Sequence, residues 1–364
     1  MNANQVVMAI LAVFFVLGAV DRCIGNRIGF GPEFERGFKL MGPIALSVLG
    51  LTCIAPAVAE LLQGVVVPVY HFFGADAAMF AGTFFSPDAG GYAVAKQLAE
   101  DPELGYFGGL VVSSIFGAAI TMAIPVAMGL IAQEDVRYLA VGMLCGFIGV
   151  PLGGVVGGWL AGLETMVILR NLAPVLIIAA VVIFGLALFP RQTIVVFQIM
   201  AKVLLIMIMI GLAAGAVEKL TGLALVEDMQ PITEGFLTVG SIGLTLGGAL
   251  PLIWLVTRTL EKPLERTGAR LGVNGASIAG FFVSLASVVP AYATMKDMNT
   301  RGKVMVSAFT ATSANILGPH LGYVASVNES YIIPMMGAKV AAAVVGLPLA
   351  LFFCKRLFEK EGGE

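Results

Sequence analysis

The chain has 364 residues, of which 59% are hydrophobic and only 12% are charged, and its mean hydropathy is +0.96. This composition lies far outside that of soluble domains and predicts an all-α polytopic membrane protein. The net charge of -2 is too small to indicate a nucleic-acid partner or binding to an anionic surface.

Taken in chain order, the long apolar segments predict membrane-spanning helices. We count about nine that satisfy the roughly 20 residues a bilayer core requires per helix. No positive charge precedes the first of them, so we expect a retained helix rather than a signal peptide. The segments cover approximately residues 5–20, 40–62, 106–131, 138–162, 173–189, 193–217, 236–257, 304–326 and 333–354.

Two further apolar stretches, 76–98 and 276–296, are interrupted by proline, glycine, serine and a charged residue. A continuous helix has no free backbone groups to offer a ligand, whereas a helix end does. We therefore predict that both stretches are broken, re-entrant helical hairpins.

The first hairpin contains the run "FFSPDAGGY", with Pro87, Asp88, Gly90 and Gly91 at the break. An ionisable residue at membrane depth costs several kcal/mol unless it is paired, and it marks a binding site or pathway by default. Asp88 is therefore the sharpest candidate for binding an ammonium group; the alternative is that it caps the following helical arm. Tyr92 lies four residues further on, where its ring could cover the bound cation or be an ordinary interfacial or core tyrosine.

The second hairpin contains "SLASVVPAY", which offers Ser284, Ser287 and Pro290 but no carboxylate. One hairpin thus supplies charge and the other hydroxyl groups. That combination suits a small amino alcohol, which needs an acid for its ammonium and neutral partners for its hydroxyl.

The spans that follow the hairpins are unusually polar, although small polar residues in spans more often serve packing than ligand binding. Asn315 and His320 rank above the rest because they are bulkier and flank the Gly318–Pro319 pair. The predicted substrate-binding residues are Asp88, Tyr92, Ser86, Ser114, Ser284, Ser287, Asn315 and His320.

Two lysines lie inside apolar segments. Lys202 lies near mid-depth of its span, and we expect it to pair with a carboxylate such as Asp88 or Glu60. Lys339 lies near a helix end, from which its ammonium can reach the membrane surface. The four cysteines have no paired spacing, so we expect no disulfide, metal site or cofactor.

Short sequence matches recur at a nearly constant shift of about 198 residues. "GAVDR" from 18 returns as "GAVEK" from 215, "GFKLMG" from 37 as "GFLTVG" from 235, and "AGTFF" from 81 as "AGFF" from 279. We interpret them as two repeats, 1–165 and 193–357, with hairpins 76–98 and 276–296, a linking span 166–192 and a tail 358–364.

Lysine and arginine set the expected orientation, because short cytoplasmic loops are enriched in them. Basic clusters lie in the loops 22–39 and 258–270, in 296–303 and in the tail from 355 to 360. If both hairpins enter and leave on one side, all four clusters are cytoplasmic, with the N-terminus outside and the C-terminus cytoplasmic. The second repeat is then inverted relative to the first, an arrangement typical of transporters with a midplane site.

Three classes of function were compared on sequence features. An enzyme is disfavoured, because HExxH, GxSxG and paired carboxylates within the breaks are absent from the sequence. A transporter is favoured by the broken segments. A narrow amine channel is the alternative, because a channel and a passive facilitator have similar sequence features.

The motifs "AGTFFSPDAGGYAVAKQLAE", "MKDMNTRGK", "HLGY" and "AVDR" closely resemble the ethanolamine transporter family EutH over nearly the whole chain. The resemblance implies a bacterial inner-membrane permease or diffusion facilitator for ethanolamine, encoded with ethanolamine-utilisation functions. The Asp-Gly-Gly pattern of the family's first hairpin maps onto residues 88–91. The family often has two asparagines where this chain has Ser287 and Val288, and an acidic residue at Pro319.

The resulting hypothesis places the ammonium of ethanolamine on Asp88 beneath Tyr92, with its hydroxyl at the second hairpin or Asn315. The repeats then open the site alternately to each side. An ion-coupled carrier of another small cationic amine is the further alternative. We expect membrane lipid around the protein, a homodimer, and no nucleic-acid partner.

Overall fold

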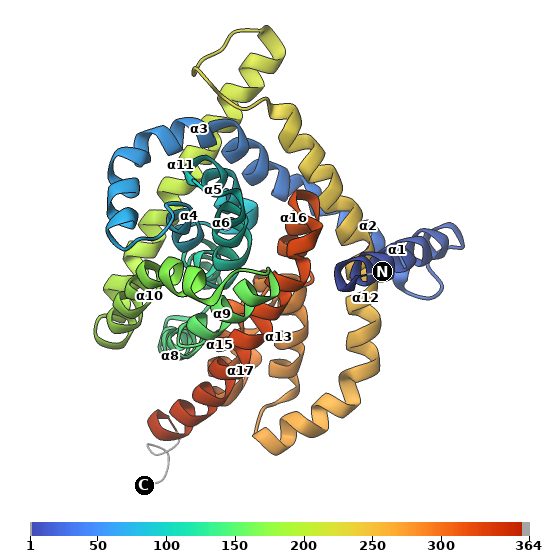
Figure 1. Cartoon of the computed structure of the whole chain (residues 1–364). Coiled ribbons are helices and arrows are strands. Elements are labelled where there is room, and N and C mark those ends of the chain that lie inside the picture. Colours follow the sequence, from blue (N-terminus) through green and yellow to red (C-terminus); the bar gives the residue numbers. More distant parts are fainter. Residues whose placement is uncertain (1, 359–364) are drawn as a thin grey trace.

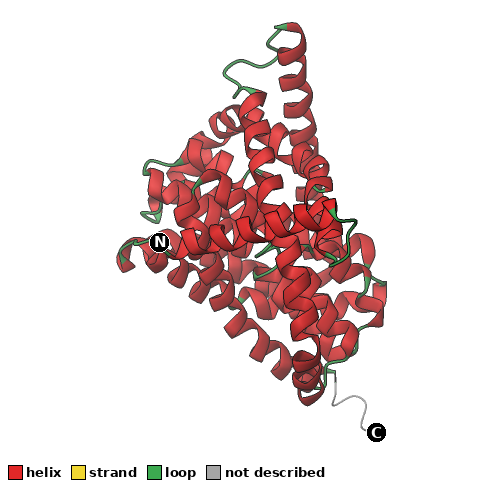
Figure 2. Cartoon of the chain, turned by 90° about the vertical axis from the view of Figure 1, so that its right-hand side faces the viewer, coloured by secondary structure: helices red, strands yellow, loops and turns green. Residues whose placement is uncertain are grey.

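The computed structural model describes residues 2–358 and, between 261 and 269, only some of the side chains. Over that range the chain consists of helices joined by turns and loops, without a strand (Figure 2). The all-α class predicted from composition is confirmed. Its physical reason is that helices satisfy their own amide groups where no water is present.

The helices differ widely in length, and the short ones cluster around breaks. The longest are α1 (Ala3–Cys23), α3 (Met41–Phe72), α10 (Thr165–Leu188), α11 (Pro190–Thr221), α12 (Ile232–Leu271) and α17 (Ile332–Leu357). The shorter ones are α2 (Phe30–Lys39), α4 (Ala78–Phe84), α5 (Gly91–Leu98), α6 (Pro102–Tyr106), α7 (Ile124–Leu130), α8 (Val136–Phe147), α9 (Val150–Leu160), α13 (Gly275–Ala286), α14 (Val288–Ala293), α15 (Thr300–Thr312) and α16 (Pro319–Val327). The remaining helical turns are η1 (Pro87–Ala89), η2 (Phe107–Gly117), η3 (Ala119–Ala123), η4 (Gln133–Asp135), η5 (Met295–Asp297) and η6 (Glu329–Tyr331).

In the described chain, six helices are long and apolar enough to cross a membrane, or up to eight if each of two bent pairs is one span. This is a multi-pass membrane protein, but the predicted count of about nine spans is not confirmed. The segments expected at 106–131 and 138–162 are each bent by 42°. The span expected at 304–326 is not one helix, because α15 ends at Thr312 and α16 begins at Pro319.

The unpredicted break between α15 and α16 has a backbone cause. Asn315 has φ of 60°, in the left-handed region through which a helix does not continue. The residue before a proline is pushed out of the helical region, which affects Gly318. Pro319 then begins α16, a position where its missing N–H leaves no bond unmade.

The chain also breaks in both segments predicted to be hairpins. In the first, α4 ends at Phe84, and Gly90, with φ of 90°, precedes the start of α5. In the second, Ser287 is extended between α13 and α14. The two arms of each hairpin pack against one another.

Apolar side chains cover the outer surfaces of several long helices. Val181 and Phe184 on α10 are 67% and 66% exposed, and Leu205 on α11 is 55% exposed. Such a surface matches lipid tails rather than water. In Figure 1, α12 runs along one side of the molecule with α1 and α2 packed beside it, while α4 and α5 lie on the other side near α3.

Glycines allow η2 to pack closely against α4 in the interior. A Cβ on Gly108 would lie 2.8 Å from the carbonyl oxygen of Ala78, and every residue from 107 to 117 is buried. Small residues at helix crossings permit this approach. Both η2 and η3 are wound as π-helix, a rare form that is frequent at functional sites. The segment also contacts η1, the turn that breaks the first hairpin.

The basic segment 258–270, expected to be a loop, is instead the last part of α12. The expectation is wrong there because the segment is rich in good helix formers (Leu, Glu, Lys and Arg), and the helix ends only before Gly272, which has φ of 70°. The side chain of Lys262 lies outside the described residues. So do residues 359–364, which include Lys360 and most of the expected tail.

Candidate functional site

The three helix breaks meet inside the protein. The turn between α15 and α16 lies against the end of α13, where the Asn315 amide donates to the Ser284 carbonyl (2.9 Å). The Leu317 amide likewise donates to the Leu285 carbonyl (3.0 Å). These bonds satisfy carbonyl groups that a helix end leaves without internal partners. Helix α16 in turn contacts η1, so the backbone breaks of both hairpins are connected through it.

Three predicted residues come together at this junction. The Ser86 hydroxyl donates to Asp88 Oδ1 at 2.5 Å and lies 3.2 Å from His320 Nε2. The distance from His320 Nε2 to Asp88 Oδ1 is 3.7 Å. Asp88 is 7% exposed and His320 is 1% exposed. The carboxylate is thus buried with polar partners, as an ionisable group at membrane depth requires.

The hydrogen-bond pattern assigns the proton on His320. Ser86 has a single hydroxyl proton, which goes to Asp88, so its oxygen accepts from His320 Nε2–H. In the neutral imidazole, Nδ1 is then a bare acceptor. That atom is buried and has no partner among the described residues. A buried acceptor without a partner is costly, and a ligand that donates a hydrogen bond would satisfy it.

Lys339, which the sequence predicts to reach the membrane surface, is instead 1% exposed. Its Nζ donates to the carbonyl oxygens of Ser114 (2.7 Å), Ala314 (2.9 Å) and Thr312 (3.4 Å). The expectation fails because Lys339 lies about two turns inside α17, too deep to escape the core. The position of Lys339 in the apolar segment, counted from its first residue, is the sequence feature that indicates its depth.

The charge of Lys339 also acts on the junction of the breaks. Its ammonium interacts electrostatically with both Asp88 and His320. The ammonium nevertheless gives its hydrogen bonds to backbone carbonyls, and among the described residues it forms no ion pair with Asp88. A cationic ligand can therefore pair with Asp88 without displacing this ammonium.

A small cavity of about 10 Å³ lies beside the junction. This is close to the smallest space that holds one water molecule. Three of the predicted residues, Ser114, Asn315 and His320, line it together with Val288 from the second hairpin. The structure therefore shows a site whose walls must separate before a larger molecule can enter.

A second pocket, of about 100 Å³, lies between α3, α5, α12 and α16. Its lining includes Tyr92 and Tyr323. The Tyr92 ring stacks on that of Tyr106, with centroids 5.2 Å apart and planes 4° from parallel. Tyr323, which was not predicted, lies one turn beyond His320 on α16. Both tyrosines therefore line this pocket, one on the helix that follows the first break and one on the helix that carries His320.

The alternative role of Asp88, as the cap of the helical arm that follows it, is not found in the structure. The cap residue of α5 is Gly90, and no side chain bonds there. Asp88 also does not share a continuous helical face with Tyr92, since the left-handed Gly90 separates them.

Two of the predicted serines, Ser114 and Ser284, contribute through their backbone. Their hydroxyls donate to the carbonyls of Val111 (2.8 Å) and Phe281 (2.7 Å), within their own helices. Their carbonyls accept from Lys339 and Asn315. Ser287 is the N-cap of α14, where its hydroxyl accepts from the Val289 amide at 3.3 Å.

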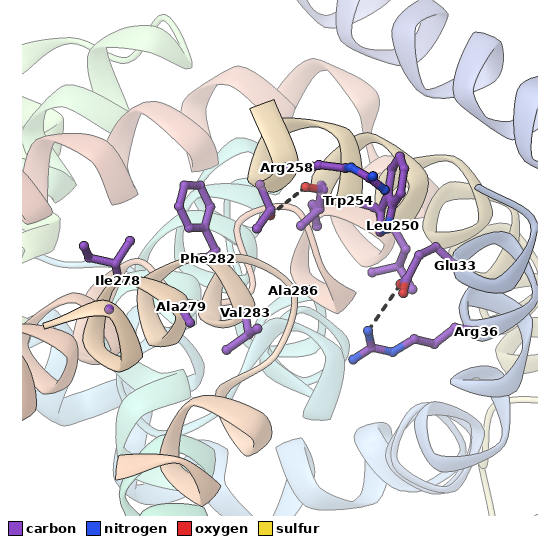
Figure 3. A pocket seen from close by; sticks show the side chains of 13 residues that line it. Glu33, Arg36, Leu250, Trp254, Arg258, Ile278, Ala279, Phe282, Val283 and Ala286 are labelled. Atoms are coloured by element: carbon purple, nitrogen blue, oxygen red, sulfur yellow. Dashed lines mark hydrogen bonds and ion pairs between the residues drawn. The ribbon is translucent and has the colours of Figure 1, made fainter. Parts of the chain in front are cut away.

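The largest of these pockets near a break, about 550 Å³, lies between α2, α12 and α13 (Figure 3). Arg258 lies 5.1 Å from the ring centroid of Trp254, and Arg36 pairs with Glu33 at 3.2 Å. The pocket extends along α13 to Ala286, the last residue before the second break. It thus connects a charged rim to the junction of the breaks.

Other charged and sulfur-containing groups lie apart from the junction. Lys202 is on the exposed side of α11, and no ion pair joins it to Asp88 or Glu60 within residues 2–358, so that prediction is wrong. The four cysteines are free. The described part of the chain holds no group of three or more His, Cys, Asp or Glu side chains placed for a metal ion.

Comparison with known proteins gives a consistent result. Residues 3–353 match the family described as "Ethanolamine utilisation protein, EutH". The chain is 39% identical to the "Probable ethanolamine permease EutH" of Listeria monocytogenes, over 99% of this chain and 96% of that protein. It is 38% identical to the protein of that name from Salmonella typhimurium, over 96% and 95%. It is 40% identical to "Uncharacterized protein YxeR" of Bacillus subtilis, over 96% and 95%. No solved structure matches the chain.

Proposed function

Because this chain belongs to the ethanolamine utilisation protein family EutH, we propose that it is a permease that carries ethanolamine across the bacterial inner membrane. The observation that carries the proposal is the buried Asp88 at a helix break, bonded to Ser86 and near His320. A carboxylate is retained at such depth when it serves a pathway or a ligand. This supports a transporter over an enzyme.

The two ends of ethanolamine match two groups of the junction. Its ammonium pairs with the Asp88 carboxylate, and its hydroxyl donates to the bare Nδ1 of His320. Asn315, which lines the same cavity, offers an amide to the hydroxyl oxygen. In this arrangement Tyr92 and Tyr323 cover the site from the side of the 100 Å³ pocket.

Two inverted repeats, 1–165 and 193–357, form the proposed framework, with 166–192 as the linking span. The order of elements supports the repeat, because each half has a long helix, a bent or continuous long helix, a broken hairpin and a broken pair. In this pairing α1 corresponds to α11, the pair α2 and α3 to α12, and hairpin 76–98 to hairpin 276–296. The segment made of α6, η2, η3 and α7 corresponds to the pair α15 and α16, and the pair α8 and α9 corresponds to α17. Inverted repeats with broken helices are the usual basis of alternating access.

Alternating access then requires a route from each side to a site that is closed in between. The pocket at Tyr92 and Tyr323 serves as the outer route, and the pocket that ends at Ala286 serves as the inner route. The cavity of about 10 Å³ between them is the closed site. With the N-terminus outside, the inner route opens among the basic residues of α2 and α12.

The need for a carrier follows from the chemistry of the amine. An aliphatic ammonium resembles that of lysine, whose reference pKa is about 10.4, so the cation dominates at neutral and acidic pH. Cations cross lipid poorly. The permease therefore matters most in acid, where the neutral amine is scarce.

Uptake of labelled ethanolamine into proteoliposomes of the purified protein tests the function. The proposal predicts uptake that saturates with concentration and is inhibited by ethylamine, because both amines compete for Asp88. Uptake that rises linearly without competition would instead indicate a narrow amine channel. No uptake above empty liposomes, with or without ion gradients, would contradict transport of ethanolamine.

A further inference from the structure

The partners of Lys339 form a small site of their own. Its Nζ contacts three backbone carbonyl oxygens, those of Ser114, Thr312 and Ala314, at 2.7 to 3.4 Å. We call these three oxygens the carbonyl cage. They come from η2, from the last residue of α15 and from the turn before α16. Two of the three oxygens therefore come from the break between α15 and α16, and the third comes from the π-helical segment η2.

Backbone carbonyls at broken helices are what transporters use to bind small cations. Unwound carbonyls and the C-terminal ends of half-helices coordinate Na⁺ in several transporter folds. The carbonyl end of a helix also carries partial negative charge, which favours a cation beside Thr312 at the end of α15. The cage thus offers the chemistry of a monovalent cation site, and the ammonium of Lys339 occupies it.

Further oxygen atoms lie close to the cage. The Ser313 hydroxyl donates to the Lys339 carbonyl at 2.7 Å and lies 3.1 Å from Thr312 Oγ1. The first bond fixes the backbone from which the lysine side chain extends. With the side chain removed, these hydroxyls and water would complete the shell of oxygens that a hard cation needs.

We propose that the Lys339 ammonium is a built-in substitute for a coupling cation, and that removing it exposes a Na⁺-binding site in the carbonyl cage. The consequence for transport, which rests on the proposed function, is that ethanolamine uptake does not depend on sodium. The site itself does not rest on that function, because ion binding is measured without substrate.

The direct test is thermal unfolding of the purified Lys339→Ala protein in NaCl and in KCl at equal ionic strength. Binding to the folded state alone stabilises it by RT ln(1 + [Na⁺]/Kd), so we expect a rise in melting temperature of roughly a few degrees that keeps growing with the logarithm of the Na⁺ concentration. Wild type and Lys202→Ala, which loses a lysine from the exposed side of α11, should melt equally in both salts. A Lys339→Ala protein that is monodisperse but melts equally in both salts overturns the proposal.

A second measurement keeps the proposal testable if Lys339→Ala does not fold. Wild-type proteoliposomes take up ethanolamine with Na⁺ or with K⁺ on both sides, and the two rates should agree. A several-fold lower rate without Na⁺ contradicts the proposal, because the wild-type cage is then not the site that replaces sodium. If wild type takes up no ethanolamine in either salt, the proposed function fails. Thermal unfolding of Lys339→Ser in the two salts then tests whether the carbonyl cage binds Na⁺.

Discussion

At the scale of single residues, the protein combines a buried carboxylate, an imidazole and an ammonium in its apolar interior. Asp88 bonds to Ser86, Ser86 accepts from His320, and Lys339 donates to the carbonyl cage. Nδ1 of His320 is buried and has no hydrogen-bond partner among the described residues. The proposed ligand contact lies at this acceptor.

His320→Gln is expected to weaken binding of the hydroxyl end of ethanolamine and to leave binding of its ammonium end unchanged. The glutamine amide can still donate to Ser86, as Nε2–H does, but it lacks an acceptor in the place of Nδ1. Losing one neutral hydrogen bond should raise the half-saturation concentration for ethanolamine about three- to tenfold. Ethylamine lacks the hydroxyl, so its inhibition of uptake should be nearly unchanged. An equal loss for both amines would show that His320 does not contact the hydroxyl.

At the scale of elements, the breaks depend on a few backbone positions. Gly90 has φ of 90°, and a Cβ there would collide with the Leu51 side chain on α3. Gly90→Ala combines left-handed strain with this collision, and we expect it to destabilise the protein by roughly 2 kcal/mol. Thermal unfolding measures the change. Gly42→Ala, in α3 with open space around it, is the control and should melt as wild type or higher. Equal melting of the two variants would contradict the strain at the first break.

The sequence predicts two of the three breaks because each interrupts an apolar run with residues that disfavour helix. Pro87 and Gly90 do so in the first hairpin, and Ser287 with Pro290 in the second. The third break, at 313–318, also has a local signal in Gly318 and Pro319, but the expected span 304–326 runs through it. Its conformation depends on tertiary hydrogen bonds to the end of α13, such as that from Asn315 to Ser284, which no local pattern specifies.

Some residues of the candidate site could likewise be predicted from the sequence, and others could not. A lone carboxylate in an apolar segment identifies Asp88, and bulky polar groups beside a Gly-Pro pair identify His320 and Asn315. Lys339 and Tyr323 were missed, because their roles come from contacts with distant segments, the carbonyls of Ser114 and Ala314 for the lysine and the pocket near α5 for the tyrosine.

At the scale of the whole molecule, two pockets of unequal size share one helix, α12. The smaller is lined by α3, α5, α12 and α16, and the larger by α2, α12 and α13. Because α12 lines both, a change in its tilt would widen one pocket and narrow the other. This shared helix is the element that we expect to move most between the two open states.

Single cysteines placed in the pockets report which side of the membrane each faces. Three native cysteines are buried, so the background protein carries only Cys23→Ser. A membrane-impermeant thiol reagent should label Lys96→Cys, in the smaller pocket, in intact cells. It should label Thr257→Cys, in the larger pocket, only after permeabilisation. Labelling of both in intact cells would contradict routes on opposite sides.

The central claim is that a buried carboxylate at a helix break holds the substrate cation. Its most direct test is ethanolamine uptake into proteoliposomes at acidic pH without an ion gradient, with Asp88→Asn compared to wild type and to Glu60→Gln. Glu60 lies on the exposed side of α3, so its variant loses the same charge away from the junction. We expect saturable uptake by wild type and Glu60→Gln and a loss of at least about tenfold in Asp88→Asn, because an uncharged amide no longer balances the ammonium. Undiminished uptake by a correctly folded Asp88→Asn protein would contradict the claim.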